Sequence, residues 1–330
     1  MPLDALSRPA AASLFALDPG FRHPYVQHWN FSVQRDLGWN TVWEVAYAGS
    51  AGKRLYEFFD ANQPAATADS TIPTNARRPR PFLGGGLTFW CSCNSSTYHS
   101  LQTKAEKRFS NGLSFLAAYT FGKSIDERSQ ASLGFGNSIG LRDFRSRHAE
   151  KGRSDYDITH RFVLSHTYDL PFGRNLKGVA KVLGEGWQLV GIHAFYTGVP
   201  FTVTARENFS NAGGSARPDV TPGVSTEPPQ GRSRQLWFNP AAFRNPTAGK
   251  WGNAGKNILS YPGTISVDLS VFKNFPLTEN TKLQFRTEFF NLPNHPNFRG
   301  LTTGFDSPSV GQLTSSQPGR QIQFALKLVF

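Results

Sequence analysis

The stretch Gln321-Ile322-Gln323-Phe324-Ala325-Leu326-Lys327-Leu328-Val329-Phe330 alternates between two kinds of side chain. One face carries Ile322, Phe324, Leu326, Leu328 and Phe330, and the other carries Gln321, Gln323 and Lys327. A period of two residues is that of a β-strand. About ten residues are enough for a tilted strand to cross a bilayer. In a soluble β-sandwich the same pattern would place one face on a second sheet and the other in water.

A hairpin with the same alternation lies farther upstream. Leu113, Phe115, Ala117, Tyr119 and Phe121 share one face of its second strand. The first strand, 98–108, has Gln102, Lys104, Glu106 and Arg108 on one face. Between them Asn111-Gly112 supplies the positive φ that a tight hairpin turn requires. The pattern therefore predicts two antiparallel strands with a short turn.

Further segments repeat this construction, which gives about nine strands in all. They are 28–34, 43–47, 162–170, 187–203, 265–271 and 283–289. Long polar stretches rich in Gly and Pro separate the hairpins at Ser50 to Ser96, Ser124 to Tyr156, Arg206 to Pro262 and Asn291 to Gly319. Such loops are implausible in a compact soluble domain. Short turns on one side and long loops on the other are typical of an outer-membrane barrel.

The composition favours the same class. Aromatic residues make up 13% of the 330 residues, and 28 of them are Phe. The chain also contains 31 Gly and 22 Pro. Aromatic residues favour strands, and Trp29, Trp43, Tyr47, Tyr119 and Trp187 fit a girdle at the membrane interface. The net charge of +12 suits nucleic acid, an anionic membrane surface or a charged lumen equally well. No apolar run approaches the length of a transmembrane helix.

Polar residues at alternate strand positions are the candidates for the inner lining of the barrel. These predicted lumen-lining residues are Lys104, Glu106, Arg108, Asp268, Lys282, Arg286 and Glu288. Their alternating signs favour salt bridges between neighbouring strands. We find no phosphate loop, metalloprotease motif or nucleophile elbow, so we expect no catalytic, cofactor-binding or metal-binding residue.

Three smaller features allow more than one interpretation. Asp155, Asp157 and His160 suggest metal ligands, but beside Arg153 and Arg161 a salt-bridged strand entrance is the simpler interpretation. The basic run Arg142, Arg145, Arg147, His148, Lys151 and Arg153 fits phosphate binding or a solvated loop. Cys91 and Cys93 leave little room for an unstrained disulfide, and we assign them no chemistry.

Several phrases together resemble the C-terminal half of TonB-dependent-transporter-like barrels of the Oar-like type, abundant in acidobacteria. They include Tyr47-Ala48-Gly49-Ser50-Ala51-Gly52-Lys53-Arg54-Leu55, Ala118-Tyr119-Thr120-Phe121-Gly122-Lys123-Ser124-Ile125-Asp126, Gly186-Trp187-Gln188-Leu189 and Arg286-Thr287-Glu288-Phe289-Phe290-Asn291-Leu292-Pro293-Asn294-His295-Pro296. The resemblance covers about 25–330. It implies that residues 25–330 are the C-terminal part of a barrel of about 22 strands and that residues 1–24 are an irregular remnant.

The resemblance also implies a cellular location and binding partners. The parent would reside in the outer membrane of a Gram-negative-type bacterium and carry a signal peptide, a plug and a TonB-energised transport activity. Met1 to Arg8 lack the features of a signal peptide, so we expect the chain to be N-terminally incomplete. The segment from Phe324 through Leu326 and Leu328 to Phe330 resembles the signal that barrel-assembly machinery recognises. Outer-membrane lipid and lipopolysaccharide are expected partners, and nucleic acid is not.

Two alternatives remain open at this point. The strands suit a soluble or surface-exposed all-β binding module, which would fold in water without detergent. They also suit a truncated barrel fragment without independent activity. The sequence names no substrate, because a polar lumen suits siderophores, oligosaccharides and peptides alike.

Overall fold

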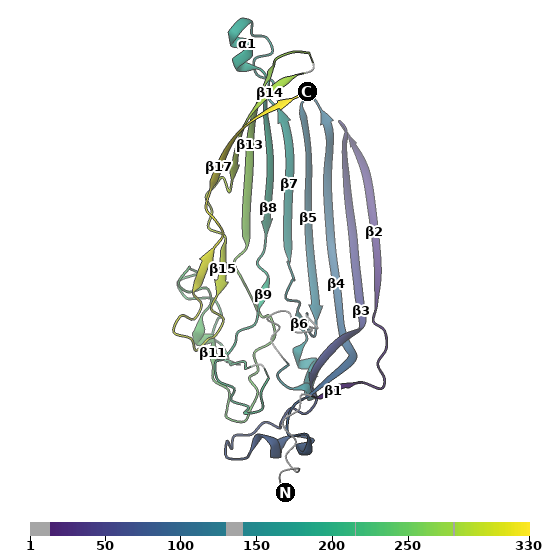
Figure 1. Cartoon of the computed structure of the whole chain (residues 1–330), viewed down its shortest axis with the longest axis vertical. Helices are drawn as coiled ribbons and strands as arrows, with labels where there is room; N and C mark the ends of the chain where they lie inside the picture. Colours follow the sequence, from purple (N-terminus) through teal and green to yellow (C-terminus); the bar gives the residue numbers. More distant parts are fainter. Residues whose placement is uncertain (1–13, 130–140, 215, 280) are drawn as a thin grey trace, which may run out of the picture.

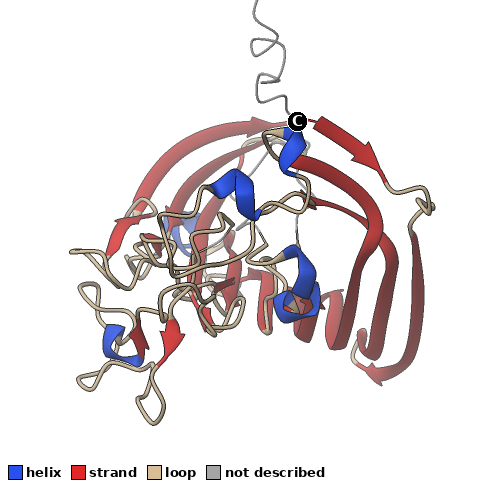
Figure 2. Ribbon diagram, turned by 90° about the horizontal axis from the view of Figure 1, so that it is seen from below, coloured by secondary structure: helices blue, strands red, loops and turns tan. Residues whose placement is uncertain are grey.

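The computed structural model describes residues 14–129, 141–214, 216–279 and 281–330. Within these ranges, eleven strands form one curved sheet, and nine of them follow a continuous antiparallel order, β17-β14-β13-β8-β7-β5-β4-β3-β2 (Figures 1 and 2). The nine strands of this order are β2 (Tyr25–Gly38), β3 (Thr41–Asp60), β4 (Leu87–Ser110), β5 (Leu113–Asp126), β7 (His160–Asp169), β8 (Trp187–Tyr196), β13 (Thr264–Pro276), β14 (Lys282–Phe290) and β17 (Gln321–Val329). The predicted all-β fold class and the count of about nine strands are confirmed.

Shorter elements lie beside and between these strands. They are β1 (Leu14–Leu17), β6 (Gly152–Arg153), β9 (Pro200–Phe201), β10 (Asp219–Val220), β11 (Phe243–Arg244), β12 (Leu259–Ser260), β15 (Phe298–Leu301), β16 (Leu313–Ser316), α1 (Gly178–Gly184), and the 3-10 turns η2 (Thr74–Arg77), η3 (Pro81–Leu83), η4 (Phe144–Glu150) and η5 (Pro240–Ala242). β1 pairs in parallel with β4, so the segment 1–24 is not wholly irregular. Met1 to Arg8 lie outside the described residues.

The connections differ sharply between the two ends of the sheet. At one end, the turn end, β2 meets β3, β4 meets β5, β7 meets β8 and β13 meets β14, and the C-terminus lies there too (Figure 1). Asn111 and Gly112 both have positive φ, 52° and 79°, as the tight turn requires. The β7–β8 connection is longer and carries α1. Long segments fill the other end, the loop end.

The two faces of the sheet have opposite character. Phe31 on β2 and Phe324 and Leu326 on β17 belong to the apolar face and are 68%, 67% and 68% exposed. The polar face is covered at the loop end, where Ser124 Oγ lies 2.9 Å from Ser154 Oγ and Lys256 contacts Asp126. Figure 2 shows the loops gathered on the concave side of the sheet. The polar face is therefore the inner one, and the apolar face would meet lipid.

Two predicted boundaries are wrong: the loop expected from Ser50 to Ser96 is too long, and the strand expected over 187–203 ends at Tyr196. The segment from Ser50 to Ser96, expected as a loop, contains the end of β3 and the start of β4, so only 61–86 connects them. The ladder between β3 and β4 is irregular at Gly52/Leu55 and again at Leu55/Tyr56. Small residues and these bulges hide the period-two pattern, because a bulge shifts side chains to the other face.

No helix among the described residues has the length and hydropathy to cross a membrane. The membrane contact of this chain is therefore argued from its strands.

Phe324→Arg tests the assignment of the two faces. Phe324 lies on the apolar face, where an arginine near the bilayer midplane costs about 2–4 kcal/mol. Gln323→Arg is the matched control, because residue 323 lies on the polar face opposite Glu288. We expect Phe324→Arg to lower the amount of folded, heat-modifiable protein in outer-membrane fractions and Gln323→Arg to preserve it. Equal loss in both variants would contradict the assignment.

Gly112→Ala tests the hairpin turn. The positive φ of Gly112 costs a residue with a Cβ about 1–2 kcal/mol, and the new Cβ would lie 3.0 Å from the Asp169 carbonyl oxygen. We expect a lower urea midpoint for unfolding in detergent. Gly304→Ala, where the nearest atom is 3.6 Å away, should leave that midpoint unchanged.

Candidate functional site

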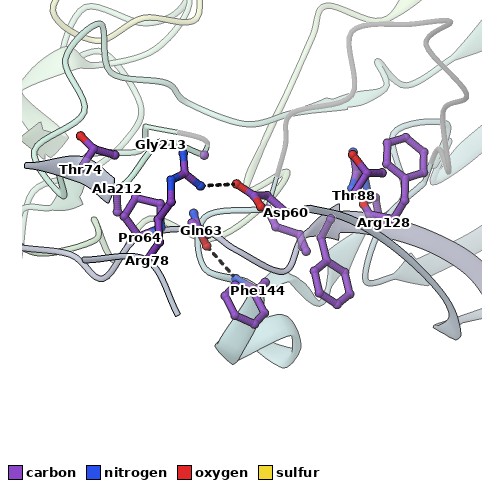
Figure 3. A pocket seen from close by; sticks show the side chains of 14 residues that line it. Asp60, Gln63, Pro64, Thr74, Arg78, Thr88, Arg128, Phe144, Ala212 and Gly213 are labelled. Atoms are coloured by element: carbon purple, nitrogen blue, oxygen red, sulfur yellow. Dashed lines mark hydrogen bonds and ion pairs between the residues drawn. The ribbon is translucent and has the colours of Figure 1, made fainter. Parts of the chain in front are cut away.

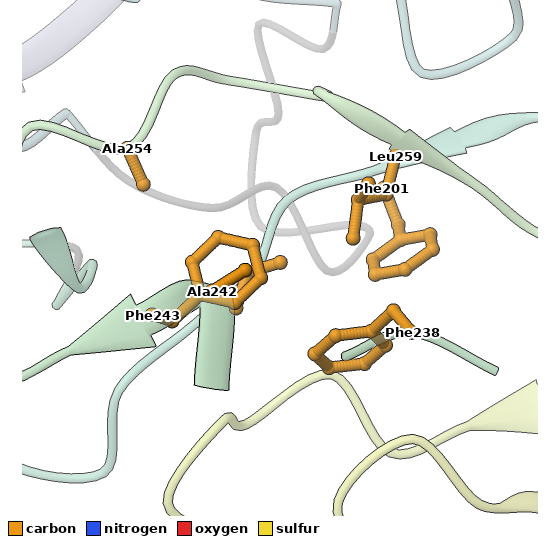
Figure 4. Close-up of a cluster of buried hydrophobic side chains, with 7 residues drawn as sticks. Phe201, Phe238, Ala242, Phe243, Ala254 and Leu259 are labelled. Carbon is orange, nitrogen blue, oxygen red and sulfur yellow. The ribbon is translucent and has the colours of Figure 1, made fainter. Parts of the chain in front are cut away.

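The long loops fold around a small apolar core of their own. Its members come from segments far apart in the sequence and include buried aromatic rings (Figure 4). They are Phe201, Val203, Phe238, Ala242, Phe243, Ala254 and Leu259. Phe238 packs edge-on against Phe243 with ring centroids 5.9 Å apart. Short pairings, β9 with β12 and β10 with β11, extend this structure. The loops therefore form an ordered cluster that can shape a binding site.

Buried charges connect two segments of this loop cluster, 142–150 and the segment that contains Arg217. Arg142 Nε donates to Glu150 Oε1 at 2.9 Å, and Arg217 Nη2 donates to Glu150 Oε2. The Arg217 side chain is 1% exposed. Desolvation lowers the pKa of Arg217, and the nearby Glu150 carboxylate opposes that effect. Buried charges persist only when paired and hydrogen-bonded, so this trio fixes the position of each segment.

Asn257 joins three backbone segments with one buried side chain. Its Nδ2 donates to the Arg153 carbonyl and to Asp155 Oδ1, both at 2.7 Å. Its Oδ1 accepts a hydrogen bond from Thr202 Oγ1 at 2.9 Å. Asn257 has a φ of 55°, which asparagine tolerates better than most residues. Both its backbone and its amide suit this junction.

One of the cavities at the loop end lies between the β3–β4 extension and the loops (Figure 3). Its volume is about 420 Å³. Phe59 stacks on Phe144 with ring centroids 5.6 Å apart. On the same wall, Arg78 Nη1 lies 3.4 Å from Asp60 Oδ2. Aromatic rings beside a charged pair suit a polar ligand of small-molecule size.

A second cavity of about 400 Å³ adjoins the first. Arg128 and Leu141 line both cavities and form the wall between them. The second cavity is richer in polar groups: its lining includes Glu127, Glu150, Asp155, Thr202, Thr204, Arg217, Lys256 and Asn257. The Arg–Glu trio and the Asn257 junction thus contribute directly to its walls. We call the two cavities together the loop-end vestibule.

The predicted lumen-lining residues fall into two separate groups. Lys104, Glu106 and Arg108 lie on β4, whereas Asp268 lies on β13 and Lys282, Arg286 and Glu288 lie on β14. Three strands separate β4 from β13, which is a gap of about 19 Å at about 4.8 Å per strand step. The structure does not bring the seven residues together as one site. Whether they line a conducting lumen stays a prediction.

Each group nevertheless makes local polar contacts on the inner face. Lys104 Nζ lies 3.5 Å from Glu44 and 3.7 Å from Glu106. Asp268 Oδ1 accepts a hydrogen bond from the Asn291 backbone N–H at 2.8 Å. The Arg286 guanidinium lies over the Phe272 ring at 4.8 Å. Of these contacts, only the Lys104–Glu44 pair is a salt bridge between neighbouring strands, as the sequence predicted.

The acidic strand entrance has a structural role. Asp157 Oδ2 lies 4.0 Å from Arg153, and Asp157 Oδ1 accepts a hydrogen bond from the Ser124 backbone N–H. The expected salt bridge with Arg153 is present. The described residues contain no group of three or more metal-ligating side chains.

The basic run is not a solvated patch throughout. Arg142 is buried against Glu150, Arg145 pairs with Asp143, and His148 lies 3.3 Å from Glu127. Arg147 packs over the Phe59 ring at 5.8 Å. The expectation of a simple solvated loop therefore fails at Arg142 and Arg147, because acidic and aromatic partners from other segments reach them.

Cys91 and Cys93 form a disulfide, contrary to our expectation. Leu55 pairs with Asn94 and Tyr56 pairs with Ser92, which leaves Cys93 as the extra residue of a bulge. The two Cα atoms lie 5.2 Å apart, inside the ordinary range for disulfides. The bulge explains why a spacing unsuited to a regular strand allows this bond.

Sequence reasoning missed the residues that shape the vestibule. Arg217 and Asn257 lie in long segments without any periodic pattern, and their partners are 55 to 104 residues away in the sequence. The one available signal was the concentration of Arg and acidic residues in 142–157.

Asn257→Ala tests the loop cluster. Removing the amide leaves buried partners unsatisfied, which costs about 1–3 kcal/mol. We expect faster proteolysis of the loops while the heat-modifiable sheet persists. Asn245→Ala, at an exposed position, is the control and should be cut at the wild-type rate. If Asn257→Ala is cut at the wild-type rate, Asn257 does not hold the loop segments together.

Comparison with known proteins agrees with this architecture. The chain is similar in fold to the outer membrane transporter YddB from Escherichia coli, with a TM-score of 0.50 and 9% sequence identity. The match covers 98% of this chain and 35% of that one, so the chain spans about a third of its length. No curated protein matches. A family model described as "Outer membrane beta barrel domain" matches residues 2–323, and the chain therefore belongs to the outer membrane β-barrel domain family.

Proposed function

We propose that this chain is the barrel part of an outer-membrane transporter that takes up a polar solute with energy delivered through TonB. The observation that carries the proposal is the loop-end vestibule above a polar, concave inner face. A solute held there lies at the entrance of the enclosed space rather than on the lipid-facing surface. The similarity in fold to an outer-membrane transporter supports the same class of activity.

The edges of the sheet support a larger barrel. Among the described residues, β2 pairs only with β3, and β17 pairs only with β14. Both β2 and β17 run toward the turn end, so joining them directly would create a parallel pair. Bacterial single-chain barrels are antiparallel and have an even number of strands. Closure therefore requires an odd number of further strands between these edges.

The proposed partners follow from this architecture. Outer-membrane lipid and lipopolysaccharide would surround the apolar face, since its exposed aromatic and aliphatic side chains suit hydrocarbon. Barrel-assembly machinery would recognise β17 through Phe324, Leu326, Leu328 and Phe330. A plug domain and TonB would act with the complete barrel. Lys104, Glu106, Asp268 and Arg286 would then line the lumen.

The location is tested by expressing the chain in a Gram-negative host. We expect recovery in the outer-membrane fraction and a band whose gel migration changes on boiling. A monodisperse folded species in plain buffer would instead favour a soluble all-β binding module. An insoluble, protease-sensitive product would favour a truncated fragment without activity.

The energy source is tested separately, by solute accumulation. Cells that carry the complete transporter should accumulate its solute only when TonB is present. Equal accumulation in a TonB-deficient strain would leave the barrel intact and exclude TonB-energised uptake.

A further inference from the structure

The Arg142–Glu150–Arg217 trio has more positive than negative charge. One carboxylate, that of Glu150, serves two guanidinium groups. The side chains of Arg142, Glu150 and Arg217 are 10%, 4% and 1% exposed. A net positive charge at such burial is costly unless another anion approaches it.

The two arginines are satisfied very differently. Arg142 uses all three of its nitrogens: Nε donates to Glu150, Nη1 to the Gly252 carbonyl and Nη2 to the Ala149 carbonyl. Arg217 donates only from Nη2, to Glu150. Its Nε and Nη1 are buried and have no hydrogen-bond partner in the described part of the chain. An arginine that served structure alone would be expected to resemble Arg142.

Arg217 also faces the second cavity of the vestibule. The other charged groups on that wall already have partners. Lys256 contacts Asp126, Glu127 lies beside His148, and Asp155 accepts a hydrogen bond from Asn257. The unused hydrogen-bonding capacity of cationic groups in this cavity is therefore concentrated at Arg217.

We propose that the second cavity binds an oxyanion, a carboxylate or a phosphate, through the guanidinium group of Arg217, which lines this cavity and has unused hydrogen-bond donors. The inference rests on the proposed function and specifies its substrate class as a polar solute that carries such a group. Thr204 and Thr303, whose hydroxyl groups lie 3.4 Å apart on the same wall, offer them to the rest of the solute. Guanidinium groups suit carboxylate and phosphate because they donate several charge-assisted hydrogen bonds.

The experiment compares probes that differ in charge but hardly in shape. The detergent-solubilised chain is titrated with succinate, with succinamide and with inorganic phosphate at constant ionic strength, and binding is measured by calorimetry. We expect succinate or phosphate to bind and succinamide not to bind. The anion that binds more tightly shows whether the site prefers a carboxylate or a phosphate group. Equal responses to succinate and succinamide, or no response to either anion, would overturn the proposal.

Variants locate the binding. Arg217→Met should abolish anion binding, and Arg217→Lys should weaken it about tenfold or more, because lysine keeps the charge but loses the second donor group. Arg244→Met removes an exposed arginine and should bind as the wild type does. Wild-type affinity in Arg217→Lys would refute the site, and this variant suffices if Arg217→Met does not fold.

The two proposals fail in different ways. Outer-membrane insertion and the heat-modifiable band are measured first on the wild-type chain. Normal insertion without anion binding would refute this inference and leave the proposed function standing. Failure to insert would refute the proposed function, whatever the calorimetry gives.

Discussion

The absence of water in the bilayer core imposes the constraint on which this structure depends. Every backbone N–H and C=O at that depth needs a partner, and neighbouring strands are the partners available to a β-chain. The ladder from β2 to β17 meets this need between the nine neighbouring strands of the described chain, and further strands would be needed to meet it at the outer edges of β2 and β17. Alternation of side chains then follows, because one face of each strand meets lipid and the other faces the concave interior.

Different physics governs the loop end. There the chain meets water, so it can carry irregular backbone, but it also buries charges that must be compensated. Glu150 compensates two arginines, and the amide of Asn257 satisfies groups from two other segments. The apolar core around Phe201 and Phe238 is small. Polar contacts of long sequence separation thus shape the vestibule together with this apolar core.

These two kinds of physics explain what the sequence predicted. Period-two alternation and the Asn111-Gly112 turn are local signals, and they predicted most strands and the separation of short turns from long loops. The β3–β4 extension escaped prediction because bulges near Gly52 and at Cys93 interrupt the alternation. The vestibule escaped it because its contacts join residues such as Glu150 and Arg217, which are 67 positions apart. The ion pair between Lys104 and Glu44 is easier to predict, because strand register alone places these two residues opposite each other.

The inner face of the sheet and the loop cluster are also mechanically connected. Ser124 and Asp126 end β5 on the polar face, and they contact Ser154, Asp157 and Lys256 of the loops. A solute taken up as proposed would pass this junction on its way from the vestibule along the polar face. Water or a polar solute can replace the junction's hydrogen bonds one at a time at modest cost. The Lys256–Asp126 ion pair is buried and costs more to separate, because each charge would lose its partner. The ion pair therefore ties the loop cluster to the end of β5 more firmly than the single hydrogen bonds do.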